Sequence, residues 1–566
     1  MLVASAFLRR LCLPRVVVVG VIAICAAIAC SPAQRSATPR QRWANASPPS
    51  RRGPVASRSF ESVADFDGDE VAGIPEPGAV ANAPSPAAPF NTESYDYRKD
   101  NDFLAARDNP ISTFSVDVDT ASYANARRFL DEGQLPPPDA VRVEEFINYF
   151  HYEATEPRGD HPIAVTSEVG PCPWSPEHRL ARIAVRAKTL APAATPPRNL
   201  TFLIDVSGSM MMPNKLPLLK RAFGALTEQL RESDRVSIVA YAGREGLVLA
   251  ATSGADKASI LDALERLEGG GSTNGGAGIR LAYKANLESR SSGSVNRVIL
   301  ATDGDFNVGV ASRGDLERLI EQERRSGVYL SVLGFGMGNL KDSTLESLAD
   351  KGNGNYAYID SFSEARKVLV EDVAGTLITI AKDVKLQLEM NPTEVASYRL
   401  VGYENRILRR EEFDDDHADA GDMGAGQTVT ALYEIVPARG AASTPSPMRY
   451  QGTAPLAPAA ANGELFTIKI RYKAPEAELS RLFETTVRDR KETLAAMSPD
   501  FHFAAAVATF GMVLRHSAHA GQGSYGLAMQ LAEQSGARHG DEHRRGFLAL
   551  VDTARRLSEK LSLTSP

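Results

Sequence analysis

Three short stretches of the chain carry side chains whose oxygen atoms could bind a metal ion. The stretches are residues 199–210, 269–276 and 298–305, and their candidate ligands are Asp205, Ser207, Ser209, Thr273 and Asp303. Carboxylates and hydroxyls are the hard oxygen ligands that small divalent cations prefer. The first stretch alone crowds one carboxylate and two hydroxyls into a single turn. The residue types therefore predict a Mg2+ site, at which Mn2+ or Ca2+ could also bind.

The segments around these residues predict an α/β fold with a doubly wound parallel sheet. An apolar run without polar alternation leads into Asp205, as is typical of a central strand that is covered on both faces. Strand-like and helical segments then alternate through residues 198–380, with a helix expected over residues 215–231. The further strands are expected at residues 236–242, 247–251, 295–302, 328–335 and 356–360. Ligands bind such sheets at the carboxyl ends of the strands, where Asp205, Thr273 and Asp303 all fall.

Together the three stretches resemble the metal-ion-dependent adhesion site of von Willebrand factor type A (vWA) domains. The shared pattern is Asp-x-Ser-x-Ser, then a threonine, then Thr-Asp-Gly. The resemblance implies that the two serines and Thr273 bind the cation directly or nearly so. It also implies that Asp205 and Asp303 hold the cation directly or through water, which leaves one position for an Asp or Glu carboxylate of a partner protein.

Each of these residues also has an ordinary structural explanation. Asp205 could cap a helix, Thr273 could be a loop hydroxyl, and Asp303 could form a turn. Asp305 and Asn307 follow on the same edge and could contact the partner, although turn chemistry explains them equally well. The occurrence of three parts in order, each in the expected relation to a strand, favours the metal site.

The order of the segments resembles a group of bacterial vWA lipoproteins that have an N-terminal extension and a C-terminal domain of unknown function. The resemblance includes residues 114–123 and covers most of residues 91–555. The expected parts are an N-terminal extension of helices and strands over residues 91–197, the vWA domain over 198–380, a β-rich domain over 381–490 and a helical segment over 491–566.

The β-rich domain is expected to be an antiparallel, sandwich-like unit. Its strands are predicted at residues 384–390, 398–403, 428–436, 465–472 and 482–487. Strands at residues 163–169 and 179–187 could complete it, which would make the vWA domain an insertion. Residues 438–462 are expected to form an exposed loop, and amphipathic helices are expected at residues 501–516, 525–535 and 543–560.

The chain begins with the features of a lipoprotein. Residues 1–29 combine a basic start with an apolar segment too short to span a membrane, which is typical of a secretory leader. Residues 27–30 resemble a bacterial lipobox, so an acylated Cys30 would tether the protein to a membrane, with about 0.8 kcal/mol per buried methylene. Ordinary cleavage or an uncleaved anchor are the alternatives. The Ala/Pro/Ser-rich residues 30–90 predict a disordered stalk, and Ser31 slightly favours the outer over the inner membrane of a bacterial cell envelope.

The composition of the chain limits the partners and the chemistry that it can have. The chain has 566 residues, 43% hydrophobic residues and a net charge of −7, so it can form several packed cores and nucleic acid is not an expected partner. Of its four cysteines, two lie in the leader and Cys30 would be lipidated, which leaves Cys172 without a partner for a disulfide. Cys172 is expected to be a small buried residue and not a nucleophile.

Several other motifs suggest chemistry that their context does not support. Ser207 lacks the Gly-x-Ser-x-Gly elbow of a hydrolase, and residues 334–338 lack the third glycine of a dinucleotide loop, so a loop near the metal edge is expected there. His539 and His543 fit the His-x-x-Glu-His spacing of a zinc protease, but that motif must lie inside a helix and Gly540 indicates a helix start.

A second aspartate-rich stretch, Asp117-x-Asp119-Thr120-x-Ser122, resembles a metal motif superficially. Capping of the following helix, expected over residues 120–132, is the preferred interpretation of Asp119 or Thr120.

These inferences converge on a membrane-anchored protein without enzymatic activity. We expect an adhesion or envelope-assembly module that binds a partner protein through a Mg2+ bridge. The alternative is an envelope scaffold or chaperone-like factor in which the metal only stabilises the fold. A zinc hydrolase is the third class.

Overall fold

A buried strand, β5 (Arg198–Asp205), lies in the middle of a six-stranded sheet in which the strand order is β10-β9-β8-β5-β6-β7. A computed structural model of the chain describes residues 92–242, 245–271, 275–304, 312–438 and 456–564. All eight residues of β5 are buried, as the apolar run predicts. The other strands of this sheet are β6 (Arg235–Tyr241), β7 (Glu245–Ser253), β8 (Val295–Thr302), β9 (Tyr329–Phe335) and β10 (Tyr356–Ile359).

One strand of this sheet departs from the predicted parallel arrangement. Strand β7 pairs antiparallel with β6 at the edge of the sheet, whereas the other pairs are parallel. Only residues 242–244 separate the two strands. A parallel connection needs a crossover of a dozen or more residues, so this spacing permits only a hairpin. The α/β class with a doubly wound core is confirmed, with an antiparallel edge strand added.

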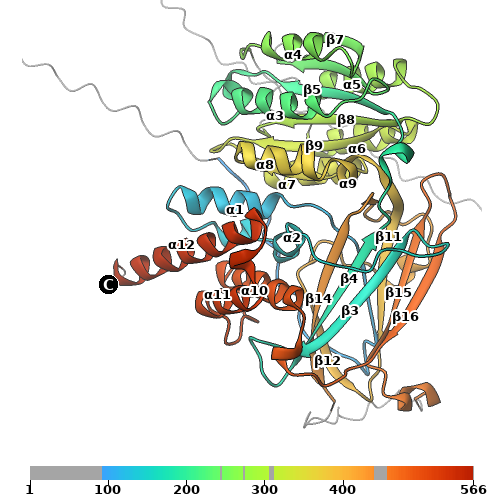
Figure 1. The fold of residues 1–566 in the computed structure, drawn as a ribbon, viewed down its shortest axis with the longest axis vertical. Helices are drawn as coiled ribbons and strands as arrows, with labels where there is room; N and C mark the ends of the chain where they lie inside the picture. Colours follow the sequence, from blue (N-terminus) through green and yellow to red (C-terminus); the bar gives the residue numbers. More distant parts are fainter. Residues whose placement is uncertain (1–91, 243–244, 272–274, 305–311, 439–455, 565–566) are drawn as a thin grey trace, which may run out of the picture. The chain divides into compact units, whose positions relative to one another are not determined.

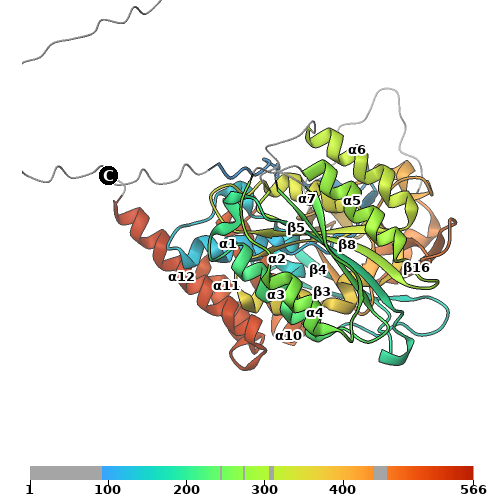
Figure 2. The same ribbon diagram turned by 90° about the horizontal axis from the view of Figure 1, so that it is seen from above.

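Helices cover both faces of the sheet, and neighbouring residues of β5 pack against helices on opposite faces. Phe202 packs in a core with α3 (Leu216–Glu228) and α4 (Lys257–Glu265), and the next residue, Leu203, packs in a different core with α5 (Gly275–Glu288). Figure 2 shows α3 and α4 on one side of the sheet and α5 on the other. The remaining helices of this region are α6 (Arg313–Glu323), α7 (Asp342–Lys351), α8 (Phe362–Arg366) and α9 (Val373–Leu377), with a π-helical turn at Lys367–Glu371.

A pair of antiparallel sheets forms the β-rich part of the chain (Figure 1). One sheet has the order β1-β12-β14-β4-β3, and in the other β13, β11, β15 and β16 follow one another while β2 also pairs with β11. Buried residues from both sheets share one hydrophobic core. The strands are β1 (Leu104–Ala105), β2 (Ile111–Ser115), β3 (Ile163–Pro171), β4 (Arg179–Ala187), β11 (Thr379–Met390), β12 (Val395–Val401), β13 (Met423–Gly424), β14 (Thr428–Pro437), β15 (Phe466–Lys473) and β16 (Arg481–Val487).

The vWA-like sheet is inserted between strands of this sandwich. Strand β4 precedes β5 in the sequence, yet it pairs antiparallel with β14, which follows the last strand of the six-stranded sheet. The two strands predicted before residue 198 therefore complete the sandwich as expected.

The helical end of the chain packs on α1 (Ala121–Asp131) and α2 (Val143–Asn148). It comprises α10 (Pro499–Leu514), α11 (Tyr525–Gln534) and α12 (Glu542–Thr564). The prediction that α10 is amphipathic is wrong, because 14 of its 16 residues are buried. A helix that is apolar on all sides is enclosed by protein, and the sequence from Phe501 to Leu514 has this character.

Short 3₁₀ turns connect these elements. They lie at Pro138–Ala140, Pro192–Ala194, Gly208–Met211, Arg324–Ser326, Arg410–Phe413, Pro458–Asn462, Leu494–Ala496 and Ala537–His539.

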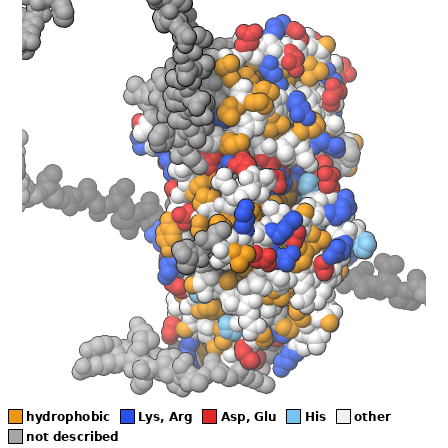
Figure 3. All heavy atoms as spheres, turned by 90° about the vertical axis from the view of Figure 1, so that its left-hand side faces the viewer, with side chains coloured by type: hydrophobic (Ala, Val, Ile, Leu, Met, Phe, Trp, Pro, Cys, Tyr) orange, Lys and Arg blue, Asp and Glu red, His pale blue; other side chains and the backbone are white. Residues whose placement is uncertain are grey.

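In the described part of the chain, no helix combines the length and apolar character needed to cross a bilayer. Acidic and basic side chains are interspersed over the face shown in Figure 3. The predicted leader, Cys30 and the predicted stalk lie outside the described residues, as does most of the predicted loop at residues 438–462.

Candidate metal centre

Two aspartates stand at the same edge of the central sheet. Asp205 is the last residue of β5, and Asp303 directly follows the last residue of β8. These strands are parallel neighbours, with Ile204 paired to Ala301, so their carboxyl ends lie side by side. Both aspartates are fully buried. The fold therefore brings together two residues that are almost a hundred positions apart in the sequence, as the alternation of strands and helices predicts.

Neutral donors orient the carboxylate of Asp205. The backbone N–H of Ser207 donates to Asp205 Oδ1 at 2.9 Å, and the hydroxyl of Thr302 donates to Oδ2 at 2.9 Å. The 3₁₀ turn that follows brings the hydroxyl oxygens of Ser207 and Ser209 to 3.0 Å from each other. Asp205 is thus not a helix cap, and its carboxylate and the two serine hydroxyls belong to one turn.

The predicted stretch at residues 269–276 lies against this turn. The N–H of Gly208 donates to the carbonyl of Gly271 at 3.2 Å, and the N–H of Gly270 donates to the carbonyl of Val206 at 2.7 Å. These bonds place the residue two positions before Thr273 beside the two serines. Thr273 itself lies outside the described residues. The predicted partner-contact residues Asp305 and Asn307 also lie outside the described residues.

The structure adds a basic residue that the sequence did not indicate. Lys215, the residue before α3, donates from Nζ to Asp303 Oδ2 at 2.9 Å and to Asn339 Oδ1 at 2.8 Å. Only 2% of Lys215 is exposed. Its position ten residues after Asp205 gives no signal, because a lysine before a helix usually faces solvent.

The two carboxylates differ in their electrostatics. Burial raises the pKa of Asp205 to about 6, against the lowering effect of the hydrogen bonds from Ser207 and Thr302. Burial also acts to raise the pKa of Asp303, but the charge of Lys215 and hydrogen bonds from Asn339 and Ser209 outweigh it, so that this pKa is lowered. A cation bound between the two carboxylates would relieve the cost of burying Asp205 in its charged form, so this donor set fits a divalent ion.

The loop after β9 completes the edge. Asn339 comes from this loop, which therefore lies at the metal edge as the glycine-rich residues 334–338 predict. Residues 92–94 pair with the loop: the N–H of Thr92 donates to the carbonyl of Gly338 at 2.7 Å, and the N–H of Gly338 donates to Glu93 Oε1 at 2.7 Å. The start of the described chain thus supports the loop that holds Lys215.

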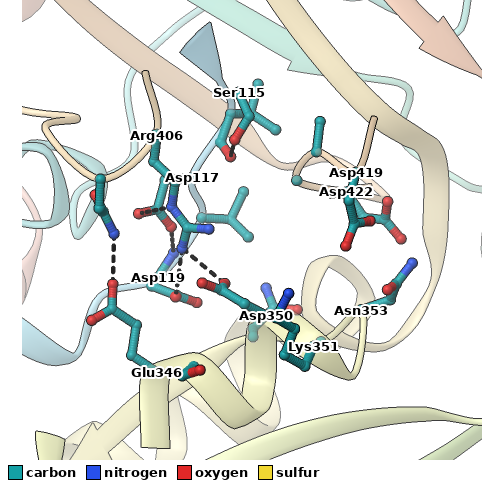
Figure 4. A pocket seen from close by; sticks show the side chains of 18 of the residues that line it. Ser115, Asp117, Asp119, Glu346, Asp350, Lys351, Asn353, Arg406, Asp419 and Asp422 are labelled. Atoms are coloured by element: carbon teal, nitrogen blue, oxygen red, sulfur yellow. Dashed lines mark hydrogen bonds and ion pairs between the residues drawn. The ribbon is translucent and has the colours of Figure 1, made fainter. Parts of the chain in front are cut away.

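The second aspartate-rich stretch forms a different kind of site (Figure 4). Arg406 donates from Nε to Asp117 at 3.0 Å, and its Nη2 donates to both Asp119, at 3.4 Å, and Asp350, at 2.9 Å. These residues line a cavity of about 350 Å³, together with Asp419 and Asp422. The predicted capping is wrong, because the N-cap Thr120 makes no side-chain cap bond and Asp119 Oδ1 accepts the N–H of Tyr356, at 2.7 Å.

The zinc-protease motif is not assembled. His539 ends a 3₁₀ turn, Gly540 follows it, and His543 lies in the first turn of α12, so the two histidines do not share a helix. His543 instead faces Glu371, with 3.4 Å between Nε2 and Oε2. Among the described residues, no group of three His, Cys, Asp or Glu side chains is placed to hold a metal ion.

Cys172 is buried, as predicted. It is 1% exposed and packs in the core with Trp174. Burial raises the pKa of its thiol well above the usual range, so the thiol is not activated as a nucleophile.

Three family models match the chain. The model of the von Willebrand factor type A domain matches residues 199–371, a von Willebrand factor model matches residues 89–182, and the C-terminal model of the uncharacterized protein YfbK matches residues 375–557.

Similar proteins extend this likeness over most of the chain. Uncharacterized protein YfbK of Escherichia coli is 42% identical over 473 residues, which is 82% of this chain and 81% of that protein. The human inter-alpha-trypsin inhibitor heavy chain H3 is 32% identical over 204 residues, which is 33% of this chain but only 22% of that protein.

Solved structures with a similar fold include a von Willebrand factor type A protein from Catenulispora acidiphila. It is 18% identical with a TM-score of 0.39, and the match covers 66% of this chain and 87% of that one. Another is proximal thread matrix protein 1 from the mussel byssus, described with a zinc-occupied MIDAS motif, which is 25% identical with a TM-score of 0.27 over 32% of this chain and 45% of that one.

Proposed function

Because the chain belongs to the vWA-domain protein family of YfbK, we propose that it binds a partner protein through a Mg2+ ion held at the carboxyl edge of the vWA sheet. The presence of the vWA domain supports a role in protein–protein interaction. The observation that carries the proposal is the convergence of two buried carboxylates and two serine hydroxyls at the ends of β5 and β8.

The side chains have distinct roles in this proposal. Ser207 and Ser209 supply hydroxyl ligands, Asp205 and Asp303 supply negative charge, and Thr273 supplies a further oxygen. Thr302 keeps Asp205 oriented through its 2.9 Å hydrogen bond. When bound, the cation supplies an electrophilic position for an Asp or Glu carboxylate of the partner. Mn2+ or Ca2+ could replace Mg2+, since the same oxygen ligands suit all three ions.

We further propose that acylated Cys30 anchors the protein in a bacterial cell envelope, with the outer membrane slightly favoured. Residues 1–30 support this by their resemblance to a lipoprotein leader. Metabolic labelling with a radioactive fatty acid should mark the wild-type protein and leave Cys30→Ser unlabelled. Equal labelling of both would show that Cys30 is not the acylated residue.

The decisive test is affinity capture from detergent-solubilised envelopes, run in Mg2+ and repeated in chelator. A partner should be retained in Mg2+ and released by chelator, and Asp205→Ala should fail to capture it in either buffer. The matched control is Asp262→Ala, which removes a 62% exposed carboxylate of α4 in the same domain and should capture normally.

Two outcomes of this test separate the rival functions. Capture that persists in chelator and in Asp205→Ala would refute the metal bridge. If removal of the metal lowers the melting temperature but leaves capture unchanged, the ion stabilises the fold and the protein is an envelope scaffold.

A further inference from the structure

A buried ammonium group occupies one side of the metal centre. Lys215 Nζ lies 2.9 Å from Asp303 Oδ2 and 2.8 Å from Asn339 Oδ1, and only 2% of the residue is exposed. Lysine is almost never buried to this degree unless it is paired, so the contact with Asp303 is the reason that it can lie here. Lys215 is therefore part of the charge of the centre and not a solvated surface group.

A glycine leaves room for the aliphatic part of the Lys215 side chain. Gly336 has a φ of +80°, and a Cβ atom added there would lie 2.1 Å from Cε of Lys215. Only glycine permits both this backbone conformation and this close approach. The hydroxyl of Tyr358 donates to the carbonyl of Gly336, which fixes the loop under the lysine.

The start of the described chain holds the same loop from the other side. Glu93 accepts the N–H of Gly338 at 2.7 Å and a hydrogen bond from Arg128 at 2.9 Å, and its side chain is 3% exposed. The N–H of Ser94 donates to the carbonyl of Leu340 at 3.2 Å. Asn339 is thus carried by a loop that is bonded at both ends, and the ammonium that it accepts from is held in place.

The ammonium of Lys215 changes the net charge of the site when a divalent ion is bound. The carboxylates of Asp205 and Asp303 would together neutralise a divalent ion. The ammonium of Lys215 leaves the loaded site with one unit of positive charge, which one carboxylate from outside would cancel. Because the site is buried, such charges are weakly screened and their interaction is strong.

We propose that Lys215 makes the centre selective for an anionic ligand, by lowering its affinity for the metal ion itself and raising the affinity of the loaded site for a carboxylate. The inference rests on the proposed function and deepens it. The ligand class is an Asp or Glu side chain or a chain terminus, and a neutral carbonyl or amide oxygen is disfavoured. In this account Lys215 acts through its charge, and its hydrogen bond to Asp303 is secondary.

The test compares metal binding with and without the charge in the full chain. Titration calorimetry measures the affinity for Mn2+ alone in the wild type, in Lys215→Met, which keeps the length of the stem, and in Lys215→Gln, which keeps a donor. Both variants should bind Mn2+ about tenfold or more tightly, since a positive charge near the ion is removed. Lys284→Met removes a lysine that is 70% exposed on α5, and it should bind as the wild type does.

The second arm adds acetate or its neutral analogue acetamide at equal concentrations. Acetate should strengthen Mn2+ binding by the wild type severalfold and acetamide should not, and the difference between them should shrink in both Lys215 variants. Thermal unfolding without metal identifies a variant that has failed to fold, and the other variant then carries the comparison.

The outcomes distinguish this inference from the proposed function. If the wild type binds Mn2+ and Asp205→Ala does not, the centre is established. Lys215 variants that bind Mn2+ equally or more weakly would then overturn the inference alone. If the wild type binds no Mn2+, or Asp205→Ala binds it equally well, both the proposed function and this inference fail.

Discussion

A carboxylate-rich site lies at each end of the strands of the vWA-like sheet, and different groups bind the carboxylates of the two sites. At the carboxyl edge, Asp205 accepts hydrogen bonds from neutral groups, the N–H of Ser207 and the hydroxyl of Thr302. At the amino edge, before β10, the guanidinium of Arg406 binds three carboxylates directly. A fixed internal cation, Arg406, pairs with all three carboxylates of the second site. At the first site Lys215 pairs with Asp303, and Asp205 and the serine hydroxyls remain suited to an added ion.

The difference shows that spacing alone does not define a metal site. Asp117, Asp119 and Ser122 have the residue types of a metal motif, but the hydroxyl of Ser122 donates to the carbonyl of Ala140 at 2.6 Å and is used by the backbone. In the Asp205 turn, the serine hydroxyls lie 3.0 Å from each other and beside the carboxylate. What separates the two stretches is where their hydroxyls point and which charged group approaches.

The largest predicted effect comes from removing the internal cation of the amino edge. Arg406→Met would leave the buried carboxylates of Asp117 and Asp119 without their shared partner, and it would also remove the ion pair of the partly exposed Asp350. We expect a loss of about 3–5 kcal/mol in the free energy of unfolding. Urea unfolding at neutral pH measures it. Arg409→Met, which removes an arginine that is 79% exposed on the same segment, should leave the unfolding curve unchanged. A loss no larger than that of the control would mean that Arg406 does not hold the site together.

A second prediction concerns pH and Asp422 in the same cavity. Its Oδ1 accepts the N–H of Asp383, while Oδ2 is buried and has no hydrogen-bond partner among the described residues. Burial raises the pKa of Asp422 from 3.8 to about 7. The folded state therefore holds this proton to a higher pH than the unfolded chain does. The group lowers the stability progressively as the pH rises from about 4 to about 7.

Asp422→Asn removes that penalty and should stabilise the protein by about 4 kcal/mol above roughly pH 7, with the gain vanishing below roughly pH 4. Unfolding measured across this range gives the profile. Asp419→Asn serves as control, because Asp419 is 45% exposed and paired with Arg324. A gain that does not change with pH would show that Asp422 is charged equally easily in both states.

Much of the fold could be predicted from the sequence because its signals are local. The apolar run before Asp205 and the alternation of strands and helices identify the central sheet. Strands β3 and β4 could be recognised from their own sequences, although β14, with which β4 pairs, comes much later in the chain. The strand at β7 was predicted, but its antiparallel direction was not, although the short connection after β6 contains the necessary information. The enclosed character of α10 could be read from residues 501–514, which are apolar on all sides, but the helices that enclose it, α2 and α11, could not.

The residues of the two sites also differ in whether the sequence could identify them. The pattern from Asp205 to Ser209 is contiguous, so its turn can be recognised in the sequence. Lys215 and Arg406 could not be assigned, because their partners are supplied by segments that lie 88 and 289 positions away, Asp303 and Asp117. Long-range ion pairs of this kind depend on the packing of whole elements, and a single sequence carries no periodic signal for them.

A smaller effect is expected at the carboxyl edge, where the donors to Asp205 are neutral. Thr302→Val removes the hydroxyl that donates to Asp205 at 2.9 Å and accepts the N–H of Gly304 at 3.1 Å. We expect a loss of about 1 kcal/mol in stability and a severalfold weaker affinity for Mn2+, since Asp205 loses its orientation. Thr227→Val removes a comparably buried hydroxyl from α3 and should change stability but not Mn2+ affinity. Normal Mn2+ binding by Thr302→Val would show that Thr302 does not position the carboxylate.

The smallest effect tests whether the second aspartate-rich stretch has any capping role. Thr120 is the N-cap of α1 but its side chain makes no cap bond, so Thr120→Ala should cost less than about 0.5 kcal/mol. Ser312→Ala should cost about 1 kcal/mol, because Ser312 and Asp315 form a reciprocal capping box at the start of α6. Thermal unfolding of the two variants under identical conditions gives the comparison. Equal losses would restore the capping interpretation of Thr120. A clear difference would show that the Thr120 side chain does not cap α1, and that the aspartates of this stretch are held by Arg406 instead.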